Sequence, residues 1–364
     1  ALASQIPAGA TSKGGVQLDE TTMASVLSEG AKAAIDIGWG ESEDLLSIES
    51  NGLLDSSEIN VGERAQKRGM KALGTLGSGN HFLELQIVDR IEDPLAAKAY
   101  GLREGQVTAM IHTGSRGLGH QVCSEHVAKI ERKYQRDGDH WVAPDWDYRL
   151  QDRQLAAAPI FSREGAAYLD AMRAAGNYAF ANRSALTQRL RNVLRNKLGV
   201  DGELDVVYDV SHNIAKVEDH IVHGKSCKCC VHRKGATRAL GGDHPELANR
   251  FSSVGQPVLV PGDMGTASWV LAGPKTGSND AFSSSCHGAG RQLSRTAARK
   301  SVDSSALIKR LEESGIHVRA KTPNVLAEEA PEAYKDVDEV IALTEAANLA
   351  RPVARLRPFA VIKG

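Results

Sequence analysis

The sequence predicts an α+β fold, in which mixed sheets are surrounded by helices, and a single domain over residues 1–364. Short β-branched runs beside Gly-rich stretches predict strands, whereas longer runs with apolar side chains at helical spacing predict helices. The chain has no internal repeat and no clear linker between two halves. We therefore assign its 364 residues to one large domain and not to two ordinary ones.

The predicted helices are distributed along the whole chain. Apolar residues recur at helical spacing over 21–38, where Gly-Trp-Gly ends the pattern. The other predicted helices cover 95–100, 120–134, 162–198, 292–300, 304–314 and 336–349. The second half of 162–198 is rich in arginine, for which a solvated face is the usual explanation and nucleic-acid binding the alternative.

The predicted strands are short, and several end beside a polar or Gly-rich turn. They cover residues 82–88, 106–111, 204–210, 226–233 and 256–260, together with the basic, apolar tail 351–364. The polar, Trp-containing segment 138–155 is predicted to be a surface insertion.

Composition limits the class of protein. With 41% hydrophobic and 24% charged residues, the chain is typical of a soluble globular protein. A formal net charge of −1 argues against a general nucleic-acid coat but is compatible with a local basic cleft. No apolar run is long enough to span a membrane, and the five cysteines are not spaced as a disulfide framework. We therefore expect a cytoplasmic protein that does not bind membranes.

Three histidines share one sequence context. His81 follows a Gly-rich loop at the start of a predicted strand, His112 closes a strand, and His212 follows a strand. Strand ends beside turns are places where a rigid scaffold presents ligands and catalytic groups, and imidazoles suit divalent transition metals. Each histidine alone is more often an ordinary surface or satisfied residue. Together they predict a metal site assembled from distant segments.

A fourth histidine, His287, lies in the Gly-rich stretch Cys286-His-Gly-Ala-Gly-Arg291. A helix that starts near Arg291 would point N–H groups at an anion, and a neutral imidazole can act as a nucleophile. A structural loop histidine is the alternative. Candidate phosphate-binding or base residues accompany the histidines: Asn80, Glu84, Arg116, Asn213, Lys234, Arg291 and Lys363. The set predicts phosphoryl or nucleotidyl transfer with a metal, and no P-loop motif is present.

The cluster Cys227-Lys-Cys-Cys-Val-His232 could suggest a zinc site. Its spacing is too tight for a zinc knuckle, and alternation along a strand would place the side chains on opposite faces. We interpret these cysteines as small, partly buried strand residues.

Six motifs in the same order resemble the RtcB family of tRNA-splicing RNA ligases, and its archaeal members most. They are Gly77-Ser-Gly-Asn-His-Phe-Leu-Glu84, His112-Thr-Gly-Ser-Arg-Gly-Leu-Gly-His120, Tyr208-Asp-Val-Ser-His-Asn213, Val231-His-Arg-Lys-Gly-Ala-Thr-Arg238, Pro261-Gly-Asp-Met-Gly-Thr-Ala-Ser268 and Cys286-His-Gly-Ala-Gly-Arg291. The resemblance extends from near Ala1 to Gly364.

The resemblance implies a GTP- and Mn²⁺-dependent ligase, with two Mn²⁺ ions expected, that joins RNA 2′,3′-cyclic phosphate or 3′-phosphate ends to 5′-hydroxyl ends. His287 would carry GMP covalently, and His81, His112 and His212 would bind metal. The implied cofactor-binding residues are Asn80, His81, Phe82, Leu83, Glu84, His212, Asn213, Pro261, Gly262, Asp263, Met264, Ser268, His287, Gly288, Ala289, Gly290, Tyr334 and Lys363. RNA is the implied partner, as tRNA halves or cleaved ends, and an archease-like activating protein is a further candidate.

Two features depart from the family pattern. The family's Asp-x-x-Cys-Gly metal motif does not occur in the sequence. Because the chain begins at Ala1, in what resembles the end of a helix, we expect the N-terminal segment with those ligands to be missing. Asp263 stands where serine is expected, and its carboxylate could accept from guanine or disfavour a phosphate. The alternative functions are a metal-dependent phosphodiesterase or phosphatase that uses the same histidines, and a catalytically inactive RNA-binding fragment.

Overall fold

The fold is built around one mixed sheet that joins distant parts of the chain. The computed structural model describes residues 2–9, 14–200, 202–320 and 323–364. Within these residues the sheet has the order β2–β1–β13–β10–β9, with β12 beside β13. Its strands are β1 (Phe82–Ile91), β2 (Val107–His112), β9 (Pro257–Val260), β10 (Ser268–Ala272), β12 (His317–Ala320) and β13 (Arg351–Lys363). The β12–β13 pair is parallel and the other pairs are antiparallel, which confirms the predicted α+β class.

The strand β13 lies at the centre of this sheet. Its side chains Val353, Ala354 and Leu356 are buried and pack in the same apolar cluster as Val270 of β10. The arginines of the same strand pair with acidic residues of other segments. Arg351, for example, pairs with Asp93. The strand that the basic, apolar tail 351–364 predicted is therefore confirmed.

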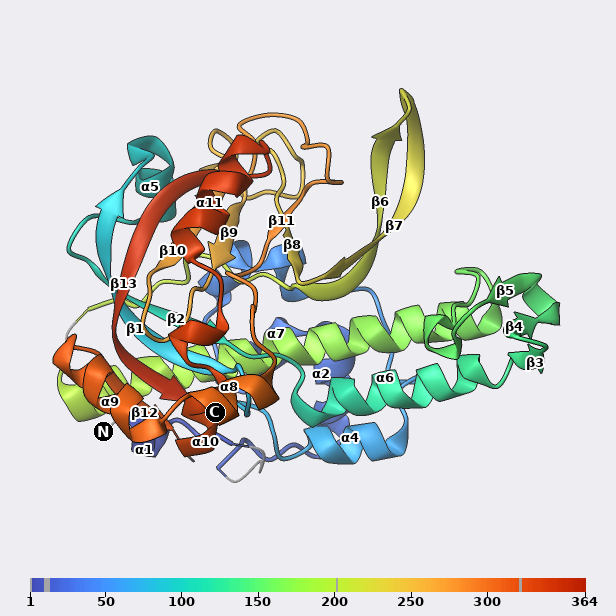
Figure 1. The fold of residues 1–364 in the computed structure, drawn as a ribbon, viewed down its shortest axis with the longest axis horizontal. Coiled ribbons are helices and arrows are strands. Elements are labelled where there is room, and N and C mark those ends of the chain that lie inside the picture. Colours follow the sequence, from blue (N-terminus) through green and yellow to red (C-terminus); the bar gives the residue numbers. More distant parts are fainter. Residues whose placement is uncertain (1, 10–13, 201, 321–322) are drawn as a thin grey trace.

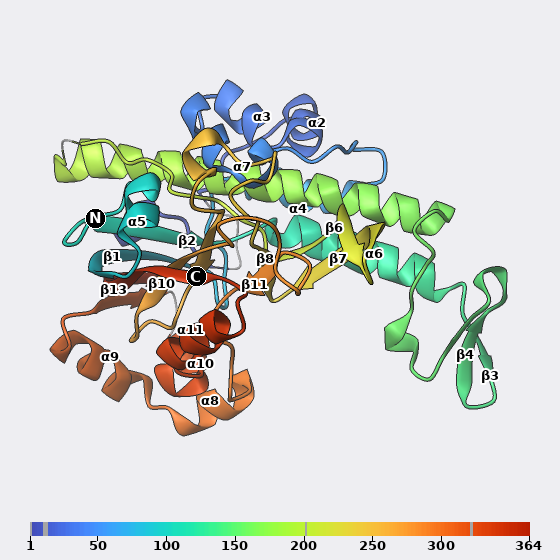
Figure 2. The ribbon, with the colours of Figure 1, turned by 90° about the horizontal axis from the view of Figure 1, so that it is seen from above.

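The helix α7 (Arg163–Leu198) separates two layers of the molecule (Figures 1 and 2). On one side of it lie α2 (Glu20–Glu29) and α3 (Ala31–Asp36), and on the other side lies the main sheet. α7 carries several fully buried alanines, and these small side chains let neighbouring helices approach closely. They are Ala171, Ala174, Ala181 and Ala185. The predicted helix over 162–198 is confirmed.

The arginines of α7 do not form the solvated basic face that was expected. Arg191 makes two contacts of 2.7 Å to the carboxylate of Asp44 and is almost fully buried. Arg189 packs over the ring of Trp39 at 5.2 Å. Arg195, near the end of the helix, is exposed. Most of this charge is thus used to attach neighbouring segments to the helix.

Three predicted helices have different limits in the structure. The segment 21–38 is two helices, because Gly30 has φ 63° and an added Cβ would lie 2.1 Å from the carbonyl oxygen of Gly52. The helix α6 (Arg116–Glu131) begins before residue 120, and α8 (Arg295–Ser301) begins after residue 292. Arg291 instead forms a backbone bridge with Tyr334, so no helix begins there.

The strand predicted over residues 204–210 is wrong. Among the described residues this segment joins no sheet, and its backbone pairing is an isolated parallel bridge between Asp209 and Ile48. Arg191 and Arg250 donate to three of its carbonyl oxygens, those of Leu204, Val206 and Val207. Side chains therefore satisfy backbone groups that a neighbouring strand would otherwise bind.

Two β modules project from the body of the protein (Figures 1 and 2). β6 (Asn213–Val222) and β7 (Lys225–Lys234) form a long hairpin, which confirms the strand predicted over 226–233. Its cysteines, Cys227, Cys229 and Cys230, are free and half-buried on β7. A small sheet of β3 (Gln135–Asp137), β4 (His140–Ala143) and β5 (Tyr148–Leu150) lies at the far end of α6 and α7, where the surface insertion was predicted.

The remaining elements connect and cover these parts. They are α1 (Leu2–Gln5), α4 (Glu63–Gly69), α5 (Pro94–Tyr100), β8 (Ala236–Arg238), β11 (Ser284–Cys286), α9 (Ser304–Glu313), α10 (Pro323–Glu328) and α11 (Val337–Ala346). The helices α8 to α10 lie on the face of the main sheet away from α7 (Figure 2). In the described ranges, no helix combines the length and apolar character that crossing a membrane requires.

Candidate active site

Three histidines meet at one end of the main sheet. His81 precedes β1 and His112 ends β2, and the pairing of Phe82 with His112 places both on neighbouring strands. His212 precedes β6. The Nε2 atoms of His112 and His212 are 3.0 Å apart, and the ring centres of His81 and His112 are 6.0 Å apart. Segments that are distant in the sequence therefore converge on one point.

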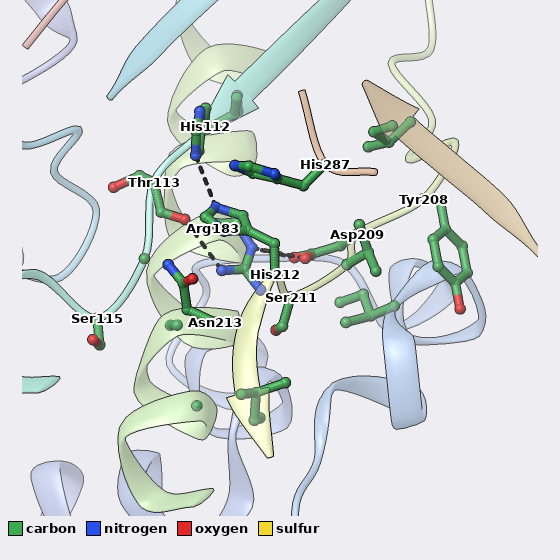
Figure 3. A pocket seen from close by; sticks show the side chains of 18 of the residues that line it. His112, Thr113, Ser115, Arg183, Tyr208, Asp209, Ser211, His212, Asn213 and His287 are labelled. Carbon is green, nitrogen blue, oxygen red and sulfur yellow. Dashed lines mark hydrogen bonds and ion pairs between the residues drawn. The ribbon is translucent and has the colours of Figure 1, made fainter. Parts of the chain in front are cut away.

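His287 lies beside the same cluster, just after β11. Its ring centre is 4.7 Å from that of His212, and the two side chains face each other (Figure 3). The ring lies close to the backbone of Gly235, because an added Cβ on that glycine would lie 3.2 Å from the ring. The four histidines line a cavity of about 1200 Å³ together with Arg116, Arg183, Lys234 and Arg295. Acidic residues also line the cavity, and one of them, Asp209, pairs with Arg183. Arg116 and Arg295 lie near His81, and Lys234 lies near His287, so the part of the cavity beside these histidines is suited to an anion.

Burial keeps these imidazoles neutral. Burial and the nearby charge of Arg116 lower the pKa of His81 to about 4, and burial together with His287 lowers the pKa of His212 to about 4. Burial also lowers the pKa of His112 and of His287. At neutral pH each ring therefore has a nitrogen with a free lone pair, as both metal binding and nucleophilic attack require.

The His112–His212 pair fits a bound transition metal. Two nitrogen ligands at about 2.1 Å from a tetrahedral ion lie about 3.4 Å apart, close to the observed 3.0 Å. The Nδ1 atoms of His81 and His212 are buried and have no hydrogen-bond partner. Among the described residues, no three His, Cys, Asp or Glu side chains already surround one point. His81 would therefore have to turn toward the other two to complete a set of three ligands.

Arg183, which was not predicted to belong to this site, connects two of the histidine segments (Figure 3). Its Nε lies 2.7 and 2.8 Å from the two carboxylate oxygens of Asp209, and its Nη1 donates to the carbonyl oxygen of Thr113 at 3.2 Å. Asp209 lies three residues before His212, and Thr113 follows His112. One side chain from α7 thus sets the spacing of the two segments.

A second polar cluster is buried where β1, β10 and β13 run side by side. Glu84 is 2% exposed and accepts from Gln86 at 2.7 Å and from Ser268 at 3.4 Å. Burial raises the pKa of Glu84 to about 7. The Nζ of Lys363 lies 5.1 Å from the centre of the Phe82 ring, and burial lowers the pKa of this lysine. The cluster offers a carboxyl, a hydroxyl and an amine to a polar ligand.

The loop that begins at Pro261 is attached to the turn that carries His287, because the N–H of Ala289 donates to the carbonyl oxygen of Pro261 at 3.2 Å. Asp263 uses its carboxylate within this loop. Its Oδ1 accepts from the N–H groups of Gly265 and Thr266 at 2.7 and 3.1 Å, and its Oδ2 accepts from the Thr266 hydroxyl at 2.8 Å. This pattern stabilises a tight turn and accounts for Asp263 without a contact to a ligand.

Comparison with known proteins agrees with the sequence motifs. The family model described as "tRNA-splicing ligase RtcB" matches residues 1–364. The chain belongs to this family. It is 48% identical to the tRNA-splicing ligase RtcB of Thermococcus kodakarensis, over 100% of this chain and 74% of the relative. It is 47% identical to that of Pyrococcus horikoshii, over 100% of this chain and 41% of the relative. It is 49% identical to the RNA-splicing ligase RtcB of Mycobacterium tuberculosis, over 99% of this chain and 81% of the relative.

The residues expected from the RtcB resemblance fall into separate groups. Those that line the cavity are Asn80, His81, His112, His212, Asn213 and His287. Phe82, Glu84, Ser268 and Lys363 belong to the second cluster. Leu83, Met264 and Ala289 pack in apolar clusters, so only their backbone groups are placed to contact a ligand. Tyr334 contacts a buried glutamate, Glu329, that was not predicted.

Proposed function

We propose that this chain is an RNA ligase of tRNA splicing and RNA repair that works through a histidine–GMP intermediate. The observation that supports this most is the position of His287, a neutral imidazole whose ring centre is 4.7 Å from that of His212. A nucleophile beside metal-type ligands, in a cavity lined by arginine and lysine, suits attack on a nucleotide phosphate. The names of the related proteins support ligation of RNA.

In the proposed first step, the lone pair of His287 attacks the α-phosphorus of GTP, a P–N bond forms, and pyrophosphate leaves. An oxygen of the RNA 3′-phosphate then attacks the same phosphorus, and the P–N bond breaks. The 5′-hydroxyl of the second RNA attacks the RNA 3′-phosphorus, forms the phosphodiester and releases GMP. A 2′,3′-cyclic phosphate is first opened by water to a 3′-phosphate. Each activation step exchanges one phosphoryl linkage for another of similar reactivity.

The chain's own residues support these steps in specific ways. The close approach of Gly235 restricts the orientation of the His287 ring, and the neutral imidazole keeps a nitrogen free to attack. Arg116, Lys234 and Arg295 line the cavity and would offset the charge of the phosphates. Mn²⁺, held by His81, His112 and His212, would add charge neutralisation at the reacting phosphate.

Intact-mass analysis after incubation with GTP and Mn²⁺ tests the proposal. The unmodified chain should gain one GMP. The control variant His140→Ala should gain one as well, because His140 lies on the distant strand β4. The His287→Ala variant should gain none. Labelling of His287→Ala, or no labelling of the unmodified chain, would contradict the proposed intermediate.

The ends of the RNA provide a second test. The chain should seal a 3′-phosphate or cyclic phosphate to a 5′-hydroxyl, but not a 3′-hydroxyl to a 5′-phosphate. Cleavage of these phosphates without sealing would favour a phosphatase or phosphodiesterase.

A further inference from the structure

We infer that Glu329 is a positioning residue of the nucleotide site. It holds in place Arg295, which lines the cavity, together with Arg291 and Lys363, so that these cations can bind the phosphates of GTP. The inference rests on the proposed function. In the sequence, Glu329 follows another glutamate, Glu328, and such an acidic pair is typical of a solvated helix end. In the structure Glu329 is instead fully buried, with 0% exposure.

The contacts of Glu329 are all with candidate ligand-binding groups. Its Oε1 lies 3.3 Å from Nη1 of Arg291 and 3.4 Å from Nε of Arg295. Its Oε2 lies 3.9 Å from Nζ of Lys363 and accepts from the hydroxyl of Tyr334. One carboxylate thus contacts three cations and a phenol.

These partners come from separate parts of the fold. Arg291 follows the His287 turn, Arg295 begins α8, and Lys363 ends the central strand β13. Like charges placed close together repel one another, and the carboxylate of Glu329 is the group that contacts all three. Glu329 therefore fixes the distance from the nucleophile's turn to the end of the sheet.

The orientation of Arg291 shows how firmly it is held. Its Nη2 donates to the carbonyl oxygen of Glu328 at 2.6 Å, its Nη1 lies 3.1 Å from the hydroxyl of Tyr334, and its guanidinium lies 4.9 Å from the centre of the Tyr334 ring. The three cations are partly offset by Glu329 and by Glu328, whose carboxylate lies 3.9 Å from Nε of Arg295. They still outnumber these two carboxylates, so the cluster can attract an anion. The arrangement is preorganised for phosphate before any ligand is bound.

A simple charge effect and a positioning effect predict opposite results. If Glu329 only reduced the positive potential of the pocket, Glu329→Gln would make anions bind more tightly. If Glu329 positions the cations, the same substitution weakens binding although the pocket becomes more positive. Misplacement of a binding group by about 1 Å can reduce function about 100-fold, so we expect at least about tenfold weaker binding.

The test measures the dissociation constants of inorganic tripolyphosphate and of GTP with Mn²⁺ by calorimetry. Glu329→Gln should weaken both, and Glu329→Asp, which keeps the charge, should lie between that variant and the unmodified chain. The matched control is Glu332→Gln, which removes a charge from a half-exposed pair with Arg310 and should change neither constant. If Glu329→Gln does not fold, Glu329→Asp must still weaken tripolyphosphate binding while the chain remains folded by circular dichroism.

The outcomes separate this inference from the proposed function. Tighter or unchanged binding in the folded Glu329 variants would overturn the positioning role. If the unmodified chain binds tripolyphosphate, and Glu329→Gln weakens this, but GTP never labels His287, the ligase mechanism fails and the positioning role stands. If the unmodified chain binds neither tripolyphosphate nor GTP, both are wrong.

Discussion

The ion pair of Arg183 and Asp209 should be essential for both stability and metal binding. Both side chains are 12% exposed, and the pair is 2.7 Å apart. Arg183→Met keeps the length of the side chain but leaves the Asp209 carboxylate buried without its partner. Removal of one partner from a buried pair costs about 3–5 kcal/mol. At about 2.1 cal/mol/K of unfolding entropy per residue, the 364 residues give about 0.76 kcal/mol/K. The melting temperature should therefore fall by about 4–7 °C.

The pH dependence of this loss has a defined sign. Burial raises the pKa of Asp209 even beside Arg183, and removal of the arginine raises it further. A carboxyl with a raised pKa binds a proton in the folded state more readily than in the unfolded state, so protonation stabilises the fold. The stability deficit of Arg183→Met should therefore be greatest above that raised pKa, and should become smaller as the pH falls through it toward the ordinary pKa of a carboxyl.

Thermal unfolding measures the loss of stability, and Mn²⁺ titration followed by electron paramagnetic resonance measures the loss of metal binding. Arg195→Met, at an exposed position of the same helix, is the matched control. The double variant Arg183→Met/Asp209→Leu should recover most of the stability, because no charge is left unpaired. It should still bind Mn²⁺ about tenfold more weakly, because the contact between Arg183 and Thr113 is lost. A double variant as unstable as the single one, or a single variant that loses less than about 1 kcal/mol, would refute the argument.

Three further predictions follow from other parts of the structure. Burial alone would raise the pKa of Glu49, but Lys216 and Arg238 outweigh it and hold the pKa at about 2. This lowered pKa means that ionised Glu49 stabilises the folded protein by about 3 kcal/mol. The stabilisation should be complete above pH 4.5 and should be lost as the pH falls toward 2. In acid titrations of unfolding, the Glu49→Gln variant should not show this loss of stability. Gly77→Ala should weaken Mn²⁺ binding by calorimetry, because its Cβ would lie 2.3 Å from Nδ1 of His81. Gly101→Ala, also at positive φ but with nothing within 4 Å, should not, and equal effects would contradict the collision. The double variant Cys227→Ser/Cys229→Ser should retain its metal content in elemental analysis, and loss of zinc would show that the cysteines bind it.

Local patterns predicted most elements of this fold but not their partners. The helix over 162–198 was predictable because its pattern is long, and the strand over 351–364 was predictable because the tail is both basic and apolar. The segment 204–210 is also apolar, but Arg191 and Arg250 bind three of its carbonyl oxygens, and its backbone pairing is limited to the bridge between Asp209 and Ile48. Side chains from remote positions decide such a case, and no local pattern contains them.

The same distinction applies to the candidate site. His81, His112, His212 and His287 were identified because each lies beside a turn with a recognisable motif. Arg183 was assigned to a solvated face of the helix. Its actual partner, Asp209, lies on another segment, and the sequence does not show that the two residues meet. Glu329 resembles an ordinary acidic helix end in the sequence, and only its burial distinguishes it. The residues that hold the site together were therefore harder to predict than the residues that face the cavity.

The central position of β13 has a consequence for how the protein is made. Phe82 pairs with Lys363, so β1 has to wait for this neighbour until β13, far along the chain, has been synthesised. During that interval the apolar strands β1 and β10 lack the partner that later lies between them, and unpaired strand edges favour aggregation. A long sequence separation between paired strands also slows folding. Synthesis of this protein should therefore depend strongly on chaperones that shield nascent strands, and chains that terminate before residue 351 should be degraded instead of accumulating as partly folded forms.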